Sequence, residues 1–179
     1  MAYGRNRGYY QKKERRDRMK LYHGSIDTVS KPEIREPSRT LDYGKGFYTT
    51  TSYEQAESWV KRHRNEGISS IGYVNVYEFD ESALDQYKTL IFNKPTEEWV
   101  DFVMQNRTVK GFTHDYDVVY GPVANDRVYA AFALYEGGIL DKQALIAELK
   151  TYKLVDQYLF HTEQSLKLLS FIEAKEVEL

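Results

Sequence analysis

The chain has 179 residues, of which 41% are hydrophobic and 29% are charged, and its formal net charge is −2. These values are typical of one globular domain with a substantial core, and no apolar run reaches the roughly 18 residues that would span a membrane. The sequence contains no cysteine, which excludes disulfides and thiolate zinc sites. We therefore expect a cytoplasmic protein with no membrane partner.

Basic residues are concentrated at the start of the chain. Residues 1–18 contain seven Lys or Arg against two acidic residues, Glu14 and Asp17, whereas the rest of the chain is acidic. This segment is predicted to be a basic N-terminal extension, for which both a nucleic-acid arm and a solvated tail are open interpretations. Residues 19–179 are predicted to form a single domain, and their acidity argues against a nucleic-acid-binding face on it.

The first predicted elements are two strands joined by an irregular connection. The segment "MKLYHGS", residues 19–25, is predicted to be a strand that ends at a Gly-Ser turn. Residues 27–42 contain two prolines and mixed charge, which favours an irregular path. A second strand is predicted for residues 47–50.

A capped helix is predicted next. Thr51 or Ser52 can accept a hydrogen bond from the first turn of this helix. Ala56, Trp59 and Val60 then fall on one helical face, which the spacing predicts to be buried. Trp59 is accordingly interpreted first as a core residue.

The remaining elements follow in no regular alternation. Strands are predicted for residues 71–80, 116–123, 156–162 and 171–179, and helices for residues 96–107, 127–138, 141–150 and 163–170. This order favours the α+β class. The sequence contains neither G-x-G-x-x-G after a strand nor a P-loop, so a nucleotide would need another kind of phosphate contact.

The segment "GKGFYTT", residues 44–50, contains two glycines around Lys45 directly before a strand. Glycines in this position indicate either a positive φ angle or a close approach of the backbone to another group. A simple hairpin corner is the alternative interpretation.

Three polar residues near strand ends are candidate site residues. His23 ends the first strand and precedes Gly24, which would let a ligand approach the backbone amide. Tyr48 follows the glycine pair, and Gln157 lies in a late strand, where alternation places it on the opposite face from Asp156. Each of the three could equally be a core residue with satisfied hydrogen bonds.

Taken together, "YHGS" at residues 22–25 and "YGKGFYTT" at residues 43–50 resemble signatures of the ADP-ribosyltransferase superfamily, in its diphtheria-toxin and poly(ADP-ribose) polymerase clade. Residues 19–179, including "YDVVYGPVAND" and "DQYLFHTEQSL", are similar to a small bacterial family assigned to that superfamily. The resemblance implies a split antiparallel β core with surrounding helices and NAD as substrate. It also implies mono-ADP-ribosyl transfer to a protein or nucleic-acid acceptor, in a toxin or phage-defence effector with an antitoxin-like partner.

The resemblance further implies a set of site residues. His23, Tyr48 and Gln157 would be catalytic, with His23 bonded to ribose hydroxyls and Tyr48 stacked on the nicotinamide ring. Further NAD contacts would come from Gly24, Ser25, Gly46, Trp59 and Arg62, although a solvated helix end is the competing interpretation of Arg62. No metal is expected, because the four histidines lack close ligand spacing.

Gln157 departs from the family pattern, which usually has Glu at this position. An amide supplies a dipole where a carboxylate would supply a full negative charge, so transition-state stabilisation would be weaker. Mono-transfer and slow NAD hydrolysis are therefore both open. A catalytically inactive NAD- or ADP-ribose-binding module is the alternative function.

Overall fold

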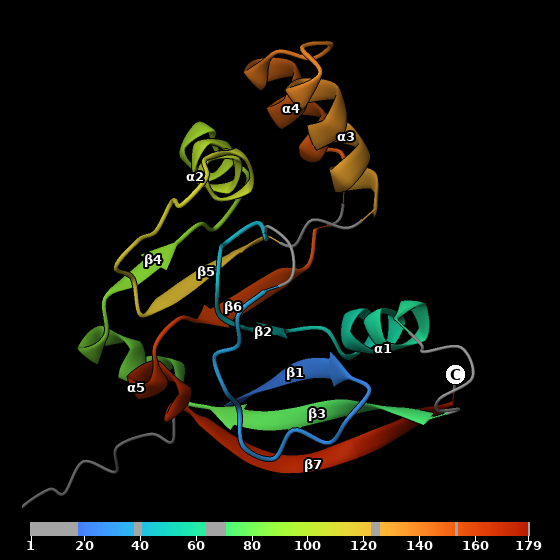
Figure 1. Cartoon of the computed structure of the whole chain (residues 1–179), viewed down its shortest axis with the longest axis vertical. Coiled ribbons are helices and arrows are strands. Elements are labelled where there is room, and N and C mark those ends of the chain that lie inside the picture. Colours follow the sequence, from blue (N-terminus) through green and yellow to red (C-terminus); the bar gives the residue numbers. More distant parts are fainter. Residues whose placement is uncertain (1–17, 38–40, 64–70, 123–125, 153, 179) are drawn as a thin grey trace, which may run out of the picture.

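The computed structural model describes residues 18–37, 41–63, 71–122, 126–152 and 154–178, which form an α+β fold around a seven-stranded sheet (Figure 1). The strands are β1 (Met19–Ser25), β2 (Phe47–Thr50), β3 (Ile71–Phe79), β4 (Thr89–Ile91), β5 (Val118–Pro122), β6 (Asp156–Phe160) and β7 (Leu169–Glu178). The helices are α1 (Tyr53–Arg62), the 3-10 helix η1 (Glu81–Gln86), α2 (Glu97–Thr108), α3 (Asp126–Glu136), α4 (Lys142–Leu149) and α5 (Glu163–Leu166). The predicted α+β class is confirmed. The basic extension, apart from Arg18, lies outside the described residues.

The strand order is β4-β5-β6-β2-β1-β3-β7. Neighbouring strands are antiparallel except β4 and β5, which are parallel, so the expectation of a purely antiparallel core is wrong at this edge. Both β4 and η1 were absent from the sequence prediction. A three-residue strand carries too short a pattern to be recognised, and it is held in place by its pairing with β5.

The sheet is weakly joined at its centre. β1 pairs with β3 along its whole length, and β2 pairs with β6 along its whole length. Between β1 and β2, however, the register contains only Tyr22 opposite Thr50. The sheet therefore divides into a β4–β5–β6–β2 half and a β1–β3–β7 half, which diverge from this point (Figure 1).

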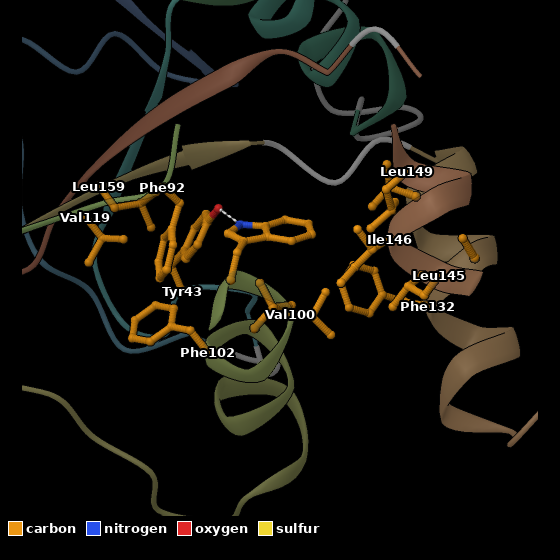
Figure 2. Packing of buried hydrophobic residues seen from close by; sticks show 14 residues of the cluster. Tyr43, Phe92, Val100, Phe102, Val119, Phe132, Leu145, Ile146, Leu149 and Leu159 are labelled. Atoms are coloured by element: carbon orange, nitrogen blue, oxygen red, sulfur yellow. Dashed lines mark hydrogen bonds between the residues drawn. The ribbon is translucent and has the colours of Figure 1, made fainter. Parts of the chain in front are cut away.

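Three hydrophobic clusters hold the halves and the helices together. One joins β5 and β6 to α2, α3 and α4 around Trp99 and Phe132 (Figure 2). A second fills the space between the two halves, where the ring of Phe79 lies 5.0 Å from that of Tyr158 and 5.8 Å from that of Phe160. The third packs Ala56 of α1 and its neighbours against β3 and β7. The alternation predicted for β6 is confirmed, because Tyr158 and Phe160 face one cluster and Leu159 faces another.

Side-chain caps fix the helix starts. Ser52 accepts from the backbone N–H of Gln55 at 3.2 Å, so it, and not Thr51, is the N-cap of α1. Thr96 and Asp141 cap α2 and α4 in the same way. Within the described part of the chain, no helix has both the length and the apolar character required to cross a bilayer.

Candidate functional site

A cleft of about 890 Å³ opens where β1 and β2 separate. Its walls come from the end of β1, from β2, from the inner side of α1, from the connection between β1 and β2, and from single residues of α3 and β6. All the residues predicted to contact NAD line this one cleft: His23, Gly24, Ser25, Gly46, Tyr48, Trp59, Arg62 and Gln157. The structure thus brings together residues that lie up to 134 positions apart, from 23 to 157.

The glycine pair before β2 has a structural reason. Gly44 has φ +78°, and a Cβ there would also lie 2.7 Å from Oδ1 of Asn106 on α2. The turn therefore requires glycine at this position. Behind Gly46 lies His161, whose Nδ1 donates to the carbonyl oxygen of Lys45 at 2.6 Å. The loop that leads into β2 turns at Gly44, whose N–H donates to the carbonyl oxygen of Leu41 at 3.1 Å, and it is also held against the protein body.

The threonines that follow attach β2 to β6. Thr49 donates through Oγ1 to the carbonyl oxygen of Tyr158 at 2.8 Å. Thr50 and Thr51 both donate to the carbonyl oxygen of Asp156, at 3.2 and 3.3 Å. These bonds fix β2 beside Gln157, which is the register partner of Thr50.

His23 presents a hydrogen-bond acceptor to the cleft. Its Nδ1 lies 2.7 Å from the carbonyl oxygen of Tyr48, which can only accept, so Nδ1 carries the proton. Burial lowers the pKa of His23; the hydrogen bond to Tyr48 opposes this shift, and the positive charge of Arg35 adds to it. The imidazole is therefore neutral at pH 7. Its Nε2 has no hydrogen-bond partner among the described residues and can accept from a hydroxyl group.

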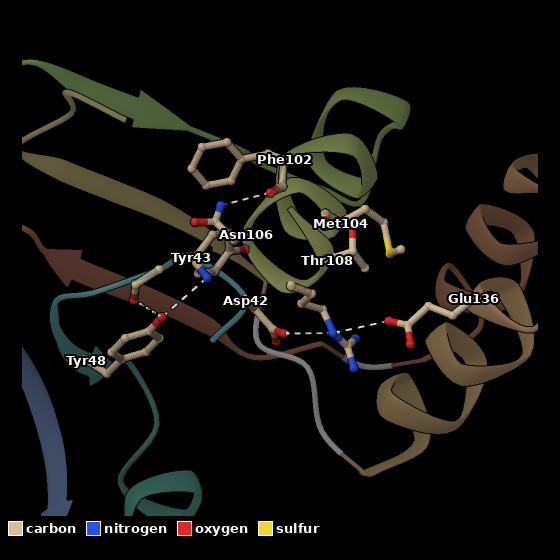
Figure 3. Close-up of polar contacts among 10 residues, drawn as sticks. Asp42, Tyr43, Tyr48, Phe102, Met104, Asn106, Thr108 and Glu136 are labelled. Carbon is tan, nitrogen blue, oxygen red and sulfur yellow. Dashed lines mark hydrogen bonds and ion pairs between the residues drawn. The ribbon is translucent and has the colours of Figure 1, made fainter. Parts of the chain in front are cut away.

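Tyr48 is a half-buried ring whose hydroxyl is fixed by the loop before it (Figure 3). The hydroxyl donates to the carbonyl oxygen of Gly44 at 2.8 Å and accepts from the backbone N–H of Tyr43 at 3.3 Å. Burial raises the pKa of Tyr48 well above its usual value, so the hydroxyl stays protonated. The ring is held rigidly at the cleft wall, as stacking on a flat ligand requires.

Gln157 is buried and lines the cleft. Its neighbour Asp156 points to the other face of the sheet, where its Oδ2 accepts from the hydroxyl of Tyr120 at 2.7 Å. Asp156 therefore brings no carboxylate to the face of the sheet on which Gln157 lies.

Trp59 is not the core residue that the helical spacing suggested. Ala56 and Val60 are buried, but Trp59 is 37% exposed and stacks on His63 with ring centroids 4.2 Å apart. Its side chain lines the cleft together with Arg62, which ends α1. Trp59 thus borders the cleft and stacks on His63 instead of lying in the core.

Gly24 serves α1 as well as the cleft. A Cβ at this position would lie 2.5 Å from the carbonyl oxygen of Ala56 and 3.0 Å from Cγ2 of Val60. The expectation that Gly24 makes room for a ligand is therefore incomplete, because its missing side chain lets the helix backbone approach β1. Beside it, Ser25 accepts from the backbone N–H of Asp27 at 3.1 Å and shapes the turn after β1.

We expect Gly24→Ala to lower the free energy of unfolding by about 2 kcal/mol, as overpacking of a close contact does. Chemical denaturation measures this loss. The same substitution is also made in the Val60→Ala variant as a control. That variant removes the contact with the Val60 side chain but keeps the contact with the backbone carbonyl of Ala56. If Gly24→Ala were harmless in either background, α1 would not approach β1 this closely.

Sequence reasoning missed several residues of the cleft. Arg35 lies in the irregular connection after β1, and Tyr129 lies on α3; both line the cleft. Asp42 also lines it and pairs with Nε of Arg107 at 3.8 Å, and Glu136 lies 3.3 Å from the same nitrogen (Figure 3). The path of a loop and a contact between helices that are distant in the sequence produce no local sequence pattern, so the sequence alone did not indicate these residues. The sequence contains 16 tyrosines, and this abundance is a signal in the composition that fits an aromatic cleft wall.

The fold is that of an α+β protein with a cleft of about 890 Å³ between the halves of its sheet. Residues 19–171 match the family described as "Protein of unknown function (DUF3990)", and the chain belongs to that family. The matched segment contains every site residue from His23 to Gln157. No curated protein matches the chain.

Proposed function

We propose that this protein binds NAD in the cleft, cleaves the bond between nicotinamide and ribose, and transfers ADP-ribose to a protein or nucleic-acid acceptor. The observation that carries this proposal is the convergence of His23, Tyr48 and Gln157 on one cleft. Ligand sites have volumes of roughly 300–1,000 Å³, and this cleft, at about 890 Å³, lies in the upper part of that range.

The chemistry of the cleft walls suits this substrate. Cleavage builds positive charge on the ribose, so a neutral acceptor such as Nε2 of His23 and the carbonyl end of the Gln157 amide favour the transition state. The ring of Tyr48 offers a stacking surface for nicotinamide. Arg35 and Arg62 supply positive charge for the pyrophosphate. Among the described residues, no group of His, Cys, Asp or Glu side chains is placed to hold a metal.

One observation favours a second candidate function. The β6 side of the cleft carries an amide at Gln157, and the nearby carboxylate of Asp156 is bonded to Tyr120 on the opposite face. A site with this arrangement could bind NAD or ADP-ribose without turnover. Under either function the protein would act in the cytoplasm, and the toxin or phage-defence role with an antitoxin-like partner rests on the family resemblance.

Trp59 gives the cleanest test of NAD binding, because its exposed side chain contributes little to the core. We expect Trp59→Ala to weaken NAD binding by about 1 to 2 kcal/mol, as measured by calorimetry, because the loss of one aromatic–base stack has this size. Leu134→Ala is the matched control, since Leu134 is 42% exposed on α3 and lies outside the cleft lining.

The same samples are assayed for nicotinamide release. Release by the wild type that falls in Trp59→Ala supports the transferase or hydrolase function. Binding without release supports the binding module. If the wild type does not bind NAD at millimolar concentration, both forms of the proposal are wrong.

A further inference from the structure

Tyr43 is fully buried behind the cleft, and its hydroxyl hydrogen is already committed. The hydroxyl donates to the carbonyl oxygen of Pro122 at 2.8 Å. It accepts from the indole N–H of Trp99 (Figure 2). A phenol hydroxyl has one hydrogen and two lone pairs. Towards any further neighbour, Tyr43 can therefore act only as an acceptor.

The register of the sheet places this hydroxyl beside Gln157. Gly121 of β5 is opposite Gln157 of β6, and side chains of opposed residues lie on the same face. A Cβ on Gly121 would lie 2.5 Å from the hydroxyl oxygen of Tyr43. The hydroxyl thus occupies the space next to Gln157 that a side chain at position 121 would otherwise fill.

The electrostatics of the hydroxyl agree with this placement. Burial strongly raises the pKa of Tyr43, whereas hydrogen bonds from the side chains of Trp99 and Gln157 act in the opposite direction. A donor stabilises the phenolate and lowers the pKa, and the only donor in a glutamine side chain is its NH₂ group.

We propose that Tyr43 is a positioning residue that fixes the direction of the Gln157 amide. The NH₂ group of Gln157 donates to the hydroxyl oxygen of Tyr43, and the carbonyl oxygen Oε1 consequently faces the cleft. The functional consequence rests on the proposed NAD cleavage. The reversed amide would present partly positive hydrogens to a ribose that is becoming positive, whereas this orientation presents an acceptor to it.

The orientation itself is tested without NAD. Amide hydrogen exchange is followed by NMR for the side-chain NH₂ of Gln157. The signal of this group is identified because it is missing from the spectrum of Gln157→Ala. We expect exchange at least tenfold slower than in a free glutamine, near-free exchange in Tyr43→Phe, and unchanged protection in Tyr158→Phe. Tyr158 is the matched control because it lies on the same strand and its hydroxyl donates to Glu81 on the other face. Equal protection in Tyr43→Phe overturns the proposal.

If Tyr43→Phe does not fold, the wild type still decides the question. A nuclear Overhauser contact between the Gln157 NH₂ protons and the Tyr43 ring must then be present, and its absence overturns the proposal.

The functional consequence is tested by nicotinamide release. Tyr43→Phe should lower the rate at saturating NAD about tenfold while changing the NAD dissociation constant less than twofold. It should cause no further loss in the Gln157→Ala background, because Tyr43 acts through Gln157. Additive losses would overturn that role. If the wild type releases no nicotinamide, the proposed cleavage is wrong, and the exchange measurement still decides the orientation.

Discussion

Acidification from pH 7 to pH 4 is expected to lower the free energy of unfolding by about 3 kcal/mol through His161 alone. Burial lowers the pKa of His161 to about 4, and the hydrogen bond to Lys45 only partly opposes this. The unfolded chain takes up this proton near pH 6.5. Between pH 6.5 and pH 4 only the unfolded state is protonated, so stability falls as pH falls. Above pH 6.5 neither state is protonated, and His161 contributes no pH dependence.

The geometry gives the reason for this behaviour. Nδ1 of His161 donates to the carbonyl oxygen of Lys45, and Nε2 is buried with no hydrogen-bond partner in the described part of the chain. A second proton would have to sit on Nε2 with no acceptor. The ring also lies 4.5 Å from that of His114, whose pKa burial likewise lowers. Acid should therefore loosen the loop that leads into β2 and Tyr48.

The measurement is urea denaturation at half-unit steps between pH 7 and pH 5, above the range in which carboxylates titrate. His161→Asn keeps a donor near the Lys45 carbonyl but cannot titrate, so below about pH 6 its stability should vary less with pH by up to about 1.4 kcal/mol per unit. His63→Asn, which replaces an exposed imidazole at the C-cap of α1, is the matched control. If His161→Asn kept the full wild-type slope, His161 would not be held neutral in the fold.

The sequence patterns that proved reliable were those with a local physical cause. β1 and β2 have the predicted bounds, because Gly24-Ser25 and the Gly44–Gly46 turn mark their ends. The cap of α1 was equally local, because Ser52, one of the two candidates, is its N-cap. The alternation in β6 correctly separated Gln157 from Asp156, since strand geometry fixes the period at two.

Trp59 shows where such reasoning reaches its limit. Ala56 lies three residues before Trp59 and four before Val60, so spacing alone assigns all three to one broad helical face. Gly24 lets α1 approach β1 so closely that only a narrow stripe of small residues fits between them. The indole is left at the margin of that stripe, at 37% exposure, where it borders the cleft. The depth of a helix–strand contact depends on the partner strand, which the helix sequence does not contain.

Gln157→Glu is expected to raise the rate of nicotinamide release tenfold or more, and Gln157→Ala to lower it. The substitution to Glu hardly changes the side-chain volume and places a carboxylate beside the ribose as it becomes positive. Each 1.36 kcal/mol removed from the barrier raises the rate tenfold. The gain requires that the introduced carboxyl be ionised in its buried position.

Tyr43 should make the introduced carboxyl at position 157 harder to ionise. Its hydroxyl hydrogen is donated to the carbonyl oxygen of Pro122 at 2.8 Å, so the introduced carboxylate would face a lone pair of the Tyr43 hydroxyl. This contact and burial should both raise the pKa of the new carboxyl above its usual value. The gain in nicotinamide release should therefore grow as pH rises through that raised pKa and vanish below it.

Release is followed from pH 5 to pH 9 for the wild type and both variants, with thermal unfolding as a control for folding. Three identical traces at background would support the binding module. A rate below wild type for Gln157→Glu at every pH would mean that the amide hydrogens donated towards Tyr43 matter more than the added charge.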